Sequence, residues 1–206
     1  MFITLEGPDG SGKTTQIQRL YGRLVAAGYD PLLTREPGGT PIGDQIRDVL
    51  HRLDNRDMID TTEILLYSAS RAQLVAQVIR PALDQGRLVL CDRYADSTMA
   101  YQGYGRQLDL EALRVITRFA TGGLKPDLTV LLDFNVEIGL RRKKAAEEWN
   151  RMDQQAIDFH QRTREGYLAL AAAEPGRWVI VDASGTVPQV SDRIWQIVSV
   201  RLRPAT

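Results

Sequence analysis

Residues 7–14 read Gly7-Pro8-Asp9-Gly10-Ser11-Gly12-Lys13-Thr14, which matches the phosphate-binding pattern G-x-x-x-x-G-K-[ST]. Residues 2–6 before it (FITLE) form a short run typical of a strand, and Ile17, Leu20 and Leu24 after it recur at helical spacing. In such a strand–loop–helix unit, backbone N–H groups and the helix N-terminus surround phosphate oxygens. The residues expected to hold a nucleoside triphosphate are Gly7, Pro8, Asp9, Gly10, Ser11, Gly12, Lys13, Thr14 and Thr15.

Two side chains of this loop have predicted chemical roles. Lys13 would reach the outer phosphates, and the hydroxyl of Thr14 would bind Mg²⁺. The alternative is a glycine-rich turn that only caps an ordinary helix. The strand before the loop and the helix after it favour the nucleotide site.

Composition limits the broad class of the protein. A chain of 206 residues, 43% of them hydrophobic, suits one sizeable core, so we expect a single domain over residues 1–206. Lys+Arg and Asp+Glu number 26 each, which argues against nucleic acid or an anionic membrane as a partner. Cys91 is the single cysteine, so an internal disulfide is excluded. With no long apolar run, and a strand that begins at residue 2, we expect a cytoplasmic protein.

Strand-like and helix-like stretches alternate along the chain. Besides residues 2–6, strands are predicted over residues 31–35, 88–92, 128–133 and 178–182, whose apolar character suits a parallel sheet with helices on both faces. Ligands on such sheets bind at the carboxyl ends of the strands. Four of these strands end in charged residues, which predicts one shared site at that edge: Glu6, Arg35, Asp92 and Asp133.

Asp92 and Arg93 follow directly after the apolar run LVLC. An aspartate that ends a buried strand beside a phosphate loop typically holds Mg²⁺, directly or through water, and an arginine after it can clamp a second phosphate. Asp92 could instead cap the segment that follows. Asp133 is the rival magnesium residue, and Arg93 favours Asp92 over it.

A predicted helix over about residues 61–85 carries an arginine within its apolar stripe. Arg71 lies between Tyr67 and the apolar residues Leu74, Val75 and Val78. A guanidinium group there needs acceptors, from a structural ion pair or from a ligand. Tyr67, one turn earlier, is either plain core or a stacking surface for a base.

Together, the motifs resemble those of the thymidylate kinase (dTMP kinase) family of P-loop nucleoside monophosphate kinases. The resemblance is nearly full-length and rests on EGPDGSGKTT, TREPGGT, YSASRAQL, CDRYADSTMAYQG, PDLTVLLD, a basic segment around residues 141–151, and FHQRTREGYLALA. It implies a three-layer α/β P-loop kinase fold with a five-stranded parallel sheet and a short mobile lid. The implied activity is Mg²⁺-dependent transfer of the γ-phosphoryl group of ATP to dTMP, for dTTP synthesis.

The resemblance also assigns roles around the acceptor. Asp9 would contact the sugar 3′-hydroxyl, Arg35 and Arg93 would hold the acceptor phosphate, and Tyr67 would stack on thymine. Arg71 would donate to thymine O4 and Gln102 would accept from N3–H, a pair that cytosine mismatches. Tyr101 would crowd the ribose 2′ position, and Ser97 or Thr98 would order the base. The residues implied for dTMP are Asp9, Arg35, Pro37, Tyr67, Arg71, Arg93, Ser97, Tyr101 and Gln102.

A basic segment, about residues 141–152, is the expected lid. One branch of the family has an arginine at the position of Gly10, so this chain resembles the branch that supplies its catalytic cation from the lid. Arg142 and Arg151 match that pattern best, whereas Lys144 stands where arginine is common. The expected catalytic residues are therefore Lys13, Arg93, Arg142 and Arg151, with Arg151 nearest the transferred group. A solvated helix face is the alternative for this segment.

Three other functions remain open at this stage. A deoxynucleoside kinase would need a carboxylate base near the 5′ position and would leave Arg35 without a phosphate partner. A GTPase switch lacks support, because no Asn-Lys-x-Asp motif occurs. An adaptor with a silent nucleotide site is disfavoured by the intact Lys13, Thr14 and Asp92. A homodimer is expected from the resemblance alone.

Overall fold

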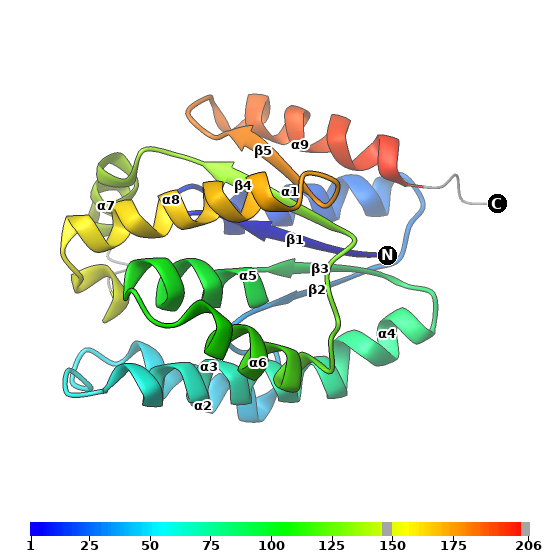
Figure 1. Cartoon of the computed structure of the whole chain (residues 1–206). Coiled ribbons are helices and arrows are strands. Elements are labelled where there is room, and N and C mark those ends of the chain that lie inside the picture. Colours follow the sequence, from blue (N-terminus) through cyan, green and yellow to red (C-terminus); the bar gives the residue numbers. More distant parts are fainter. Residues whose placement is uncertain (146–149, 203–206) are drawn as a thin grey trace.

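A computed structural model describes residues 1–145 and 150–202. Five strands form one parallel sheet in the order β2-β3-β1-β4-β5, as the alternating pattern predicted (Figure 1). The bounds of the strands equal the predicted ranges: β1 Phe2–Glu6, β2 Pro31–Arg35, β3 Leu88–Asp92, β4 Leu128–Asp133 and β5 Trp178–Asp182. The α/β class is therefore confirmed, with β1 in the middle of the sheet between β3 and β4.

Helical segments cover both faces of this sheet (Figure 1). Those of the described residues are α1 Lys13–Ala26, α2 Pro41–His51, α3 Asp60–Leu74, η1 Val75–Ile79, α4 Arg80–Asp84, α5 Ala95–Thr98, η2 Met99–Gly105, α6 Leu110–Thr121, α7 Val136–Ala145, η3 Met152–Gln154, α8 Ile157–Ala173 and α9 Val187–Arg201. None of them has the length and apolar character that a bilayer crossing requires.

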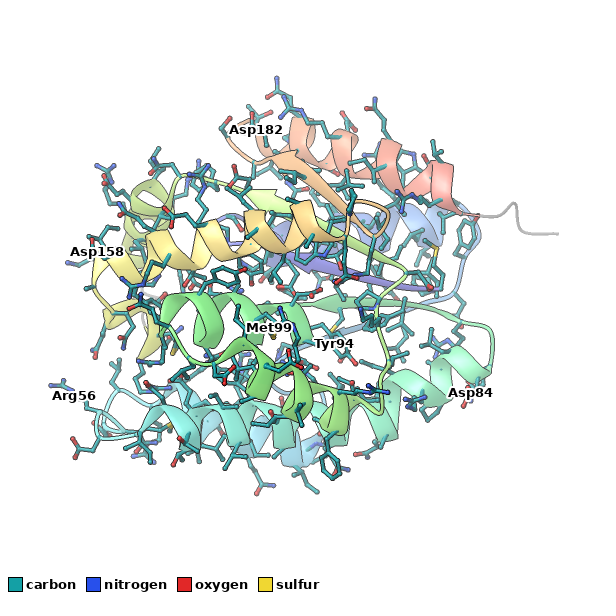
Figure 2. All side chains as sticks on the ribbon, viewed as in Figure 1. Arg56, Asp84, Tyr94, Met99, Asp158 and Asp182 are labelled. Carbon is teal, nitrogen blue, oxygen red and sulfur yellow. The ribbon has the colours of Figure 1, made fainter. Side chains whose placement is uncertain are left out.

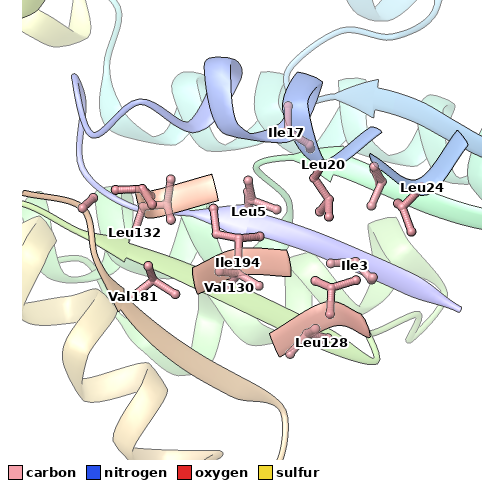
Figure 3. Packing of buried hydrophobic residues seen from close by; sticks show 14 of the residues in the cluster. Ile3, Leu5, Ile17, Leu20, Leu24, Leu128, Val130, Leu132, Val181 and Ile194 are labelled. Carbon is pink, nitrogen blue, oxygen red and sulfur yellow. The ribbon is translucent and has the colours of Figure 1, made fainter. Parts of the chain in front are cut away.

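The core is divided by the sheet, because alternate strand residues point to opposite faces. On one face Ile3 and Leu5 of β1 pack against α1 and α9, through side chains such as Leu20 and Ile194 (Figure 3). On the other face Phe2 packs with Leu74 and Val75 from the α3–η1 segment. Burial on both faces explains why the central strands β1, β3 and β4 read as continuous apolar runs, whereas the edge strands β2 and β5 are only partly buried.

The layering determines which side chains are buried and which are exposed. Tyr94 and Met99 are buried in the interior, whereas Arg56, Asp84, Asp158 and Asp182 project from the surface (Figure 2). The interior Tyr94 stacks edge-on against Phe2 of β1 with ring centroids 4.9 Å apart. The segment after β3 is thereby held against the sheet close to the strand ends.

One expected helix is more complex than its pattern suggested. The chain is helical over most of the predicted range 61–85, but a π-helical segment, Val75–Ile79, separates α3 from α4. Pro81 lies in the first turn of α4, where its missing N–H removes a hydrogen bond from the preceding turn. The expected lid, about residues 141–152, is described only in part. Its residues 146–149 lie outside the described ranges.

Candidate active site

The phosphate loop joins β1 to α1 at the carboxyl edge of the sheet. Gly12 caps α1 with φ of 89°, and Gly10 has φ of 73°, so both adopt the left-handed conformation that favours glycine. Lys13 is buried and its Nζ donates to the carbonyl oxygens of Gly7, at 3.0 Å, and Pro8, at 2.8 Å. Burial, with the nearby charge of Arg93, lowers the pKa of Lys13 to about 7. The ammonium group is held at the loop where phosphates would replace the carbonyls as partners.

Asp92 and Thr14 meet beside the loop. Thr14 Oγ1 donates to Asp92 Oδ2 at 2.8 Å, so a hydroxyl and a carboxylate oxygen converge as a hard cation prefers. The rival Asp133 is occupied, because Arg164 Nε and Nη2 donate to its two oxygens at 2.6 and 2.8 Å. Within the described ranges no group of three or more His, Cys, Asp or Glu side chains could hold a metal by itself. This fits Mg²⁺ that takes most ligands from phosphates and water.

Two cavities open at this edge of the sheet. The outer cavity, about 640 Å³, lies along the phosphate loop and is lined by Asp9, Gly10, Gly12, Lys13, Thr14, Thr15, Arg35, Glu36, Arg47, His51, Asp92, Arg93, Arg142, Lys143 and Asn150. The inner cavity lies deeper, between α3 and η2, and is lined by Asp9, Glu36, Pro37, Arg47, His51, Tyr67, Arg71, Arg93, Tyr94, Ser97, Thr98, Tyr101, Gln102, Asn150 and Met152. Six residues line both, so the two cavities adjoin: Asp9, Glu36, Arg47, His51, Arg93 and Asn150.

Arg93 stands at the junction of the cavities. Its backbone has φ of 68°, a left-handed conformation that costs a non-glycine residue energy and recurs at functional sites. Its Nη2 donates to Asp9 Oδ1 at 2.8 Å and to the Tyr101 hydroxyl at 2.9 Å. Its Nη1 donates to Gly7 O at 3.1 Å and to the Tyr167 hydroxyl at 3.0 Å. These contacts fix the guanidinium group before any ligand arrives.

Asp9 is drawn into the same network. Tyr101 donates its hydroxyl to Asp9 Oδ2 at 2.6 Å, and Lys143 Nζ lies 3.8 Å from Oδ1. Burial would raise the pKa of Asp9, but Arg93, Lys143 and Lys13 outweigh it and hold the pKa well below its usual range. Asp9 is therefore an ionised acceptor that faces both cavities.

Arg71 makes the structural ion pair that was one of its two predicted roles, and it also lines the inner cavity. Its Nε donates to Glu36 Oε2 at 2.7 Å and its Nη2 to Tyr94 O at 3.3 Å, deep in the structure. Its Nη1 is buried and has no hydrogen-bond partner among residues 1–145 and 150–202, and Arg71 lines the inner cavity. An unpaired donor of a buried guanidinium is costly, so it fits a ligand acceptor in that cavity.

The remaining residues predicted for the acceptor fall into two groups. Pro37, Tyr67, Ser97, Tyr101 and Gln102 line the inner cavity. Ser97 also donates to the buried Glu6, at 2.6 Å. Arg35 lines the outer cavity instead and is largely exposed, with a 3.4 Å contact to Asp44.

Four of the six residues that line both cavities were missed from the sequence: Glu36, Arg47, His51 and Asn150. Arg47 and His51 stand one turn apart on α2, and Arg47 Nη1 donates to Pro37 O at 2.9 Å. Burial, with the nearby charges of Arg47 and Lys143, lowers the pKa of His51 to about 3, so its imidazole is neutral. Arg47 and His51 are four residues apart and so share one face of a helix, but only the packing of α2 on α3 shows that this face borders the cavities.

Only part of the basic segment lies at the outer cavity. Arg142 and Lys143 line it, and Arg142 stacks on the Phe134 ring at 4.3 Å from the centroid. Lys143 Nζ donates to Asp153 at 2.6 Å. Arg151 differs from its expected placement, because it lines neither cavity. It is buried, donates to Leu50 O at 2.9 Å and pairs with Glu63, which satisfies its charge away from the phosphate loop.

Known proteins resemble this chain in sequence over nearly its whole length. A model of the family described as thymidylate kinase matches residues 5–194. A protein named thymidylate kinase from Deinococcus radiodurans is 54% identical over 202 residues, which cover 98% of this chain and 97% of the relative. Another of that name, from Roseiflexus castenholzii, is 51% identical, covering 96% of this chain and 92% of the relative. With the P-loop, the parallel sheet and these matches over nearly its whole length, the chain belongs to the thymidylate kinase family.

Proposed function

We propose that this protein is an ATP-dependent dTMP kinase, which transfers the γ-phosphoryl group of ATP to dTMP and forms dTDP and ADP. The observation that carries this proposal is the junction of the two cavities. ATP phosphates along the loop and an acceptor phosphate in the inner cavity would meet at Arg93 and Arg47. Two negatively charged groups need cations at their point of contact.

Phosphoryl transfer itself requires positioning and positive charge more than covalent chemistry. Lys13 would hold the outer phosphates and Arg93 the acceptor phosphate, while Arg142 and Lys143 supply charge from the lid side. Thr14 and Asp92 would hold Mg²⁺, which would supply positive charge to the phosphates. Arg151 is assigned no contact with the transferred group, since its guanidinium is paired with Glu63.

Base selection is proposed for the inner cavity. The unpaired Nη1 of Arg71 would donate to thymine O4, and Gln102 would accept from N3–H. Tyr67 would stack on the ring, and Tyr101 would exclude a 2′-hydroxyl. Cytosine presents an amino donor to Arg71 and a ring acceptor to Gln102, so both contacts would be mismatched.

The decisive experiment is an acceptor panel with purified protein and Mg-ATP. We expect rapid ADP release with dTMP, slow release with dUMP, and hardly any with dCMP, AMP or thymidine. Each monophosphate is also tested at saturating concentration, so that weak binding is separated from slow transfer. Strong turnover of thymidine with none of dTMP would make the protein a nucleoside kinase.

Further features follow from the family resemblance. We propose a single kinase domain, a homodimer in the cytoplasm, and a lid over about residues 141–152 that closes on the phosphates. A closed lid would exclude water, which competes with dTMP as the acceptor.

A further inference from the structure

Glu63 on α3 is a buried carboxylate outside both cavities that accepts four hydrogen bonds. Its Oε1 accepts from Gln102 Nε2 at 2.9 Å and from Arg106 Nε at 2.8 Å. Its Oε2 accepts from Arg106 Nη2 at 2.9 Å and from Arg151 Nη2. An ionised carboxylate offers about four lone-pair sites, so these donors saturate it.

The charge state of Glu63 follows from these partners. Its side chain is fully buried, and burial alone would raise its pKa. Hydrogen bonds and charge from Arg106, with further bonds from Gln102 and Arg151, outweigh burial and lower the pKa. Glu63 is therefore an anion that only accepts hydrogen bonds.

An acceptor-only neighbour determines which way the amide of Gln102 faces. The NH₂ group must point to Glu63, because the carbonyl oxygen of the amide would be repelled there. The carbonyl oxygen is then the amide atom left for a ligand in the inner cavity, which Gln102 lines. A base that presents an N–H to this carbonyl oxygen can donate a hydrogen bond to it, whereas a base that presents a ring acceptor cannot.

We infer that Glu63 is a positioning residue for acceptor specificity, which selects thymine over cytosine by locking the amide orientation of Gln102. The inference rests on the proposed dTMP kinase function. Arg106 and Arg151 support the lock by keeping Glu63 ionised and immobile. Because Arg106 bonds both oxygens of Glu63, the single contact of Arg151 supports the cluster but is not required for the lock.

The test is Glu63→Gln, which preserves shape but adds an NH₂ group. A neutral amide both donates and accepts, so Gln102 is then free to turn its own NH₂ group toward the base. We expect the ratio of kcat/KM for dTMP to that for dCMP to fall about tenfold or more. Glu63→Asp is the matched control, because it disturbs packing but stays acceptor-only, and it should retain most of the ratio.

Removing the Glu63 anion takes the ion-pair partner from the buried Arg151 and leaves Arg106 paired with Asp60 at 3.2 Å, which can prevent folding. The double variant Glu63→Gln/Arg151→Gln restores the wild-type charge of the cluster, and Arg151→Gln alone is its control. The selectivity ratio should fall in the double variant and persist in the single one. An unchanged ratio in a folded Glu63→Gln or double variant would overturn the inference. If the wild-type protein does not phosphorylate dTMP, the proposed function itself fails, independently of Glu63.

Discussion

Single residues of the site are determined largely by burial and by the charge of their neighbours. Glu6 at the end of β1 is fully buried and accepts from Tyr94 N at 2.7 Å, Ser97 Oγ at 2.6 Å and the Tyr167 hydroxyl at 2.9 Å. Burial, with the charge of Asp96, raises the pKa of Glu6 to about 7. The same hydroxyl of Tyr167 also contacts Arg93, so Glu6 supports the site from behind.

The raised pKa makes stability depend on pH. Folded Glu6 holds its proton up to about pH 7, whereas the unfolded carboxyl releases it near 4.5. Its stabilising contribution is present below pH 4.5 and is lost as the pH rises through 7. Relative to Glu6→Gln, the wild-type free energy of unfolding should therefore fall between pH 5 and pH 8, by on the order of 2 kcal/mol. Urea unfolding of both proteins measures this, and a pH-independent difference would contradict it.

Sequence motifs predicted some residues of the site and missed others. The loop pattern identified Lys13 and Thr14, because a phosphate site needs those side chains at fixed offsets from the glycines. Arg47 and His51 carry no such pattern, and only the packing of α2 brings them to the cavities. Arg151 lines neither cavity in this structure. Its basic surroundings suggested a position beside the phosphates, but its guanidinium group pairs with Glu63, a buried anion on α3.

Among the elements, α7 and the phosphate loop meet backbone to backbone. A Cβ atom on Gly10 would lie 2.1 Å from Gly139 O, and one on Gly139 would lie 2.2 Å from Asp9 O. Two features therefore favour glycine at position 10: its left-handed backbone and the lack of space for a Cβ atom. The close approach brings Arg142 and Lys143, one turn later on α7, to the outer cavity.

Gly139→Ala should push α7 away from the loop. We expect a loss of about 1–3 kcal/mol in stability from overpacking, and a fall in kcat because Asp9 and the loop are displaced together. Thermal unfolding and steady-state kinetics with ATP and dTMP provide the measurements.

Gly22→Ala is the control for this substitution. Gly22 lies within α1, and a Cβ atom on it would meet no atom within 4 Å, so alanine should add about 0.5–1 kcal/mol of stability. Activity should stay near that of the wild type. A Gly139→Ala protein that behaves like this control would show that α7 does not constrain the loop.

For the molecule as a whole, an exposed apolar face on α6 is consistent with the proposed homodimer. Phe119 is 91% exposed and Val115, one turn earlier, is 62% exposed. Exposed apolar side chains in adjacent turns of one helix commonly mark contact surfaces.

Phe119→Glu should therefore weaken self-association and shift the protein toward monomers in sedimentation velocity. A charge at the centre of an apolar contact costs desolvation without a partner. Val200→Glu on α9, where the wild-type valine is 87% exposed, is the matched control and should leave the dimer intact. A wild-type protein that sediments as a monomer at all concentrations would remove the basis for this prediction.

The sequence by itself determined the five strands and the place of the phosphate loop between β1 and α1. The strands follow from apolar runs, and the central strands β1, β3 and β4 are buried on both faces of the sheet. The loop follows from glycines and a lysine at fixed spacing. Tertiary structure decided which charged side chains meet. Asp92 rather than Asp133 adjoins Thr14, and Arg151 pairs with Glu63, because hydrogen-bond partners come from strands and helices distant in sequence. The local sequence pattern determines which strand or helix forms, whereas the partner of a buried charge depends on the packing of the whole molecule.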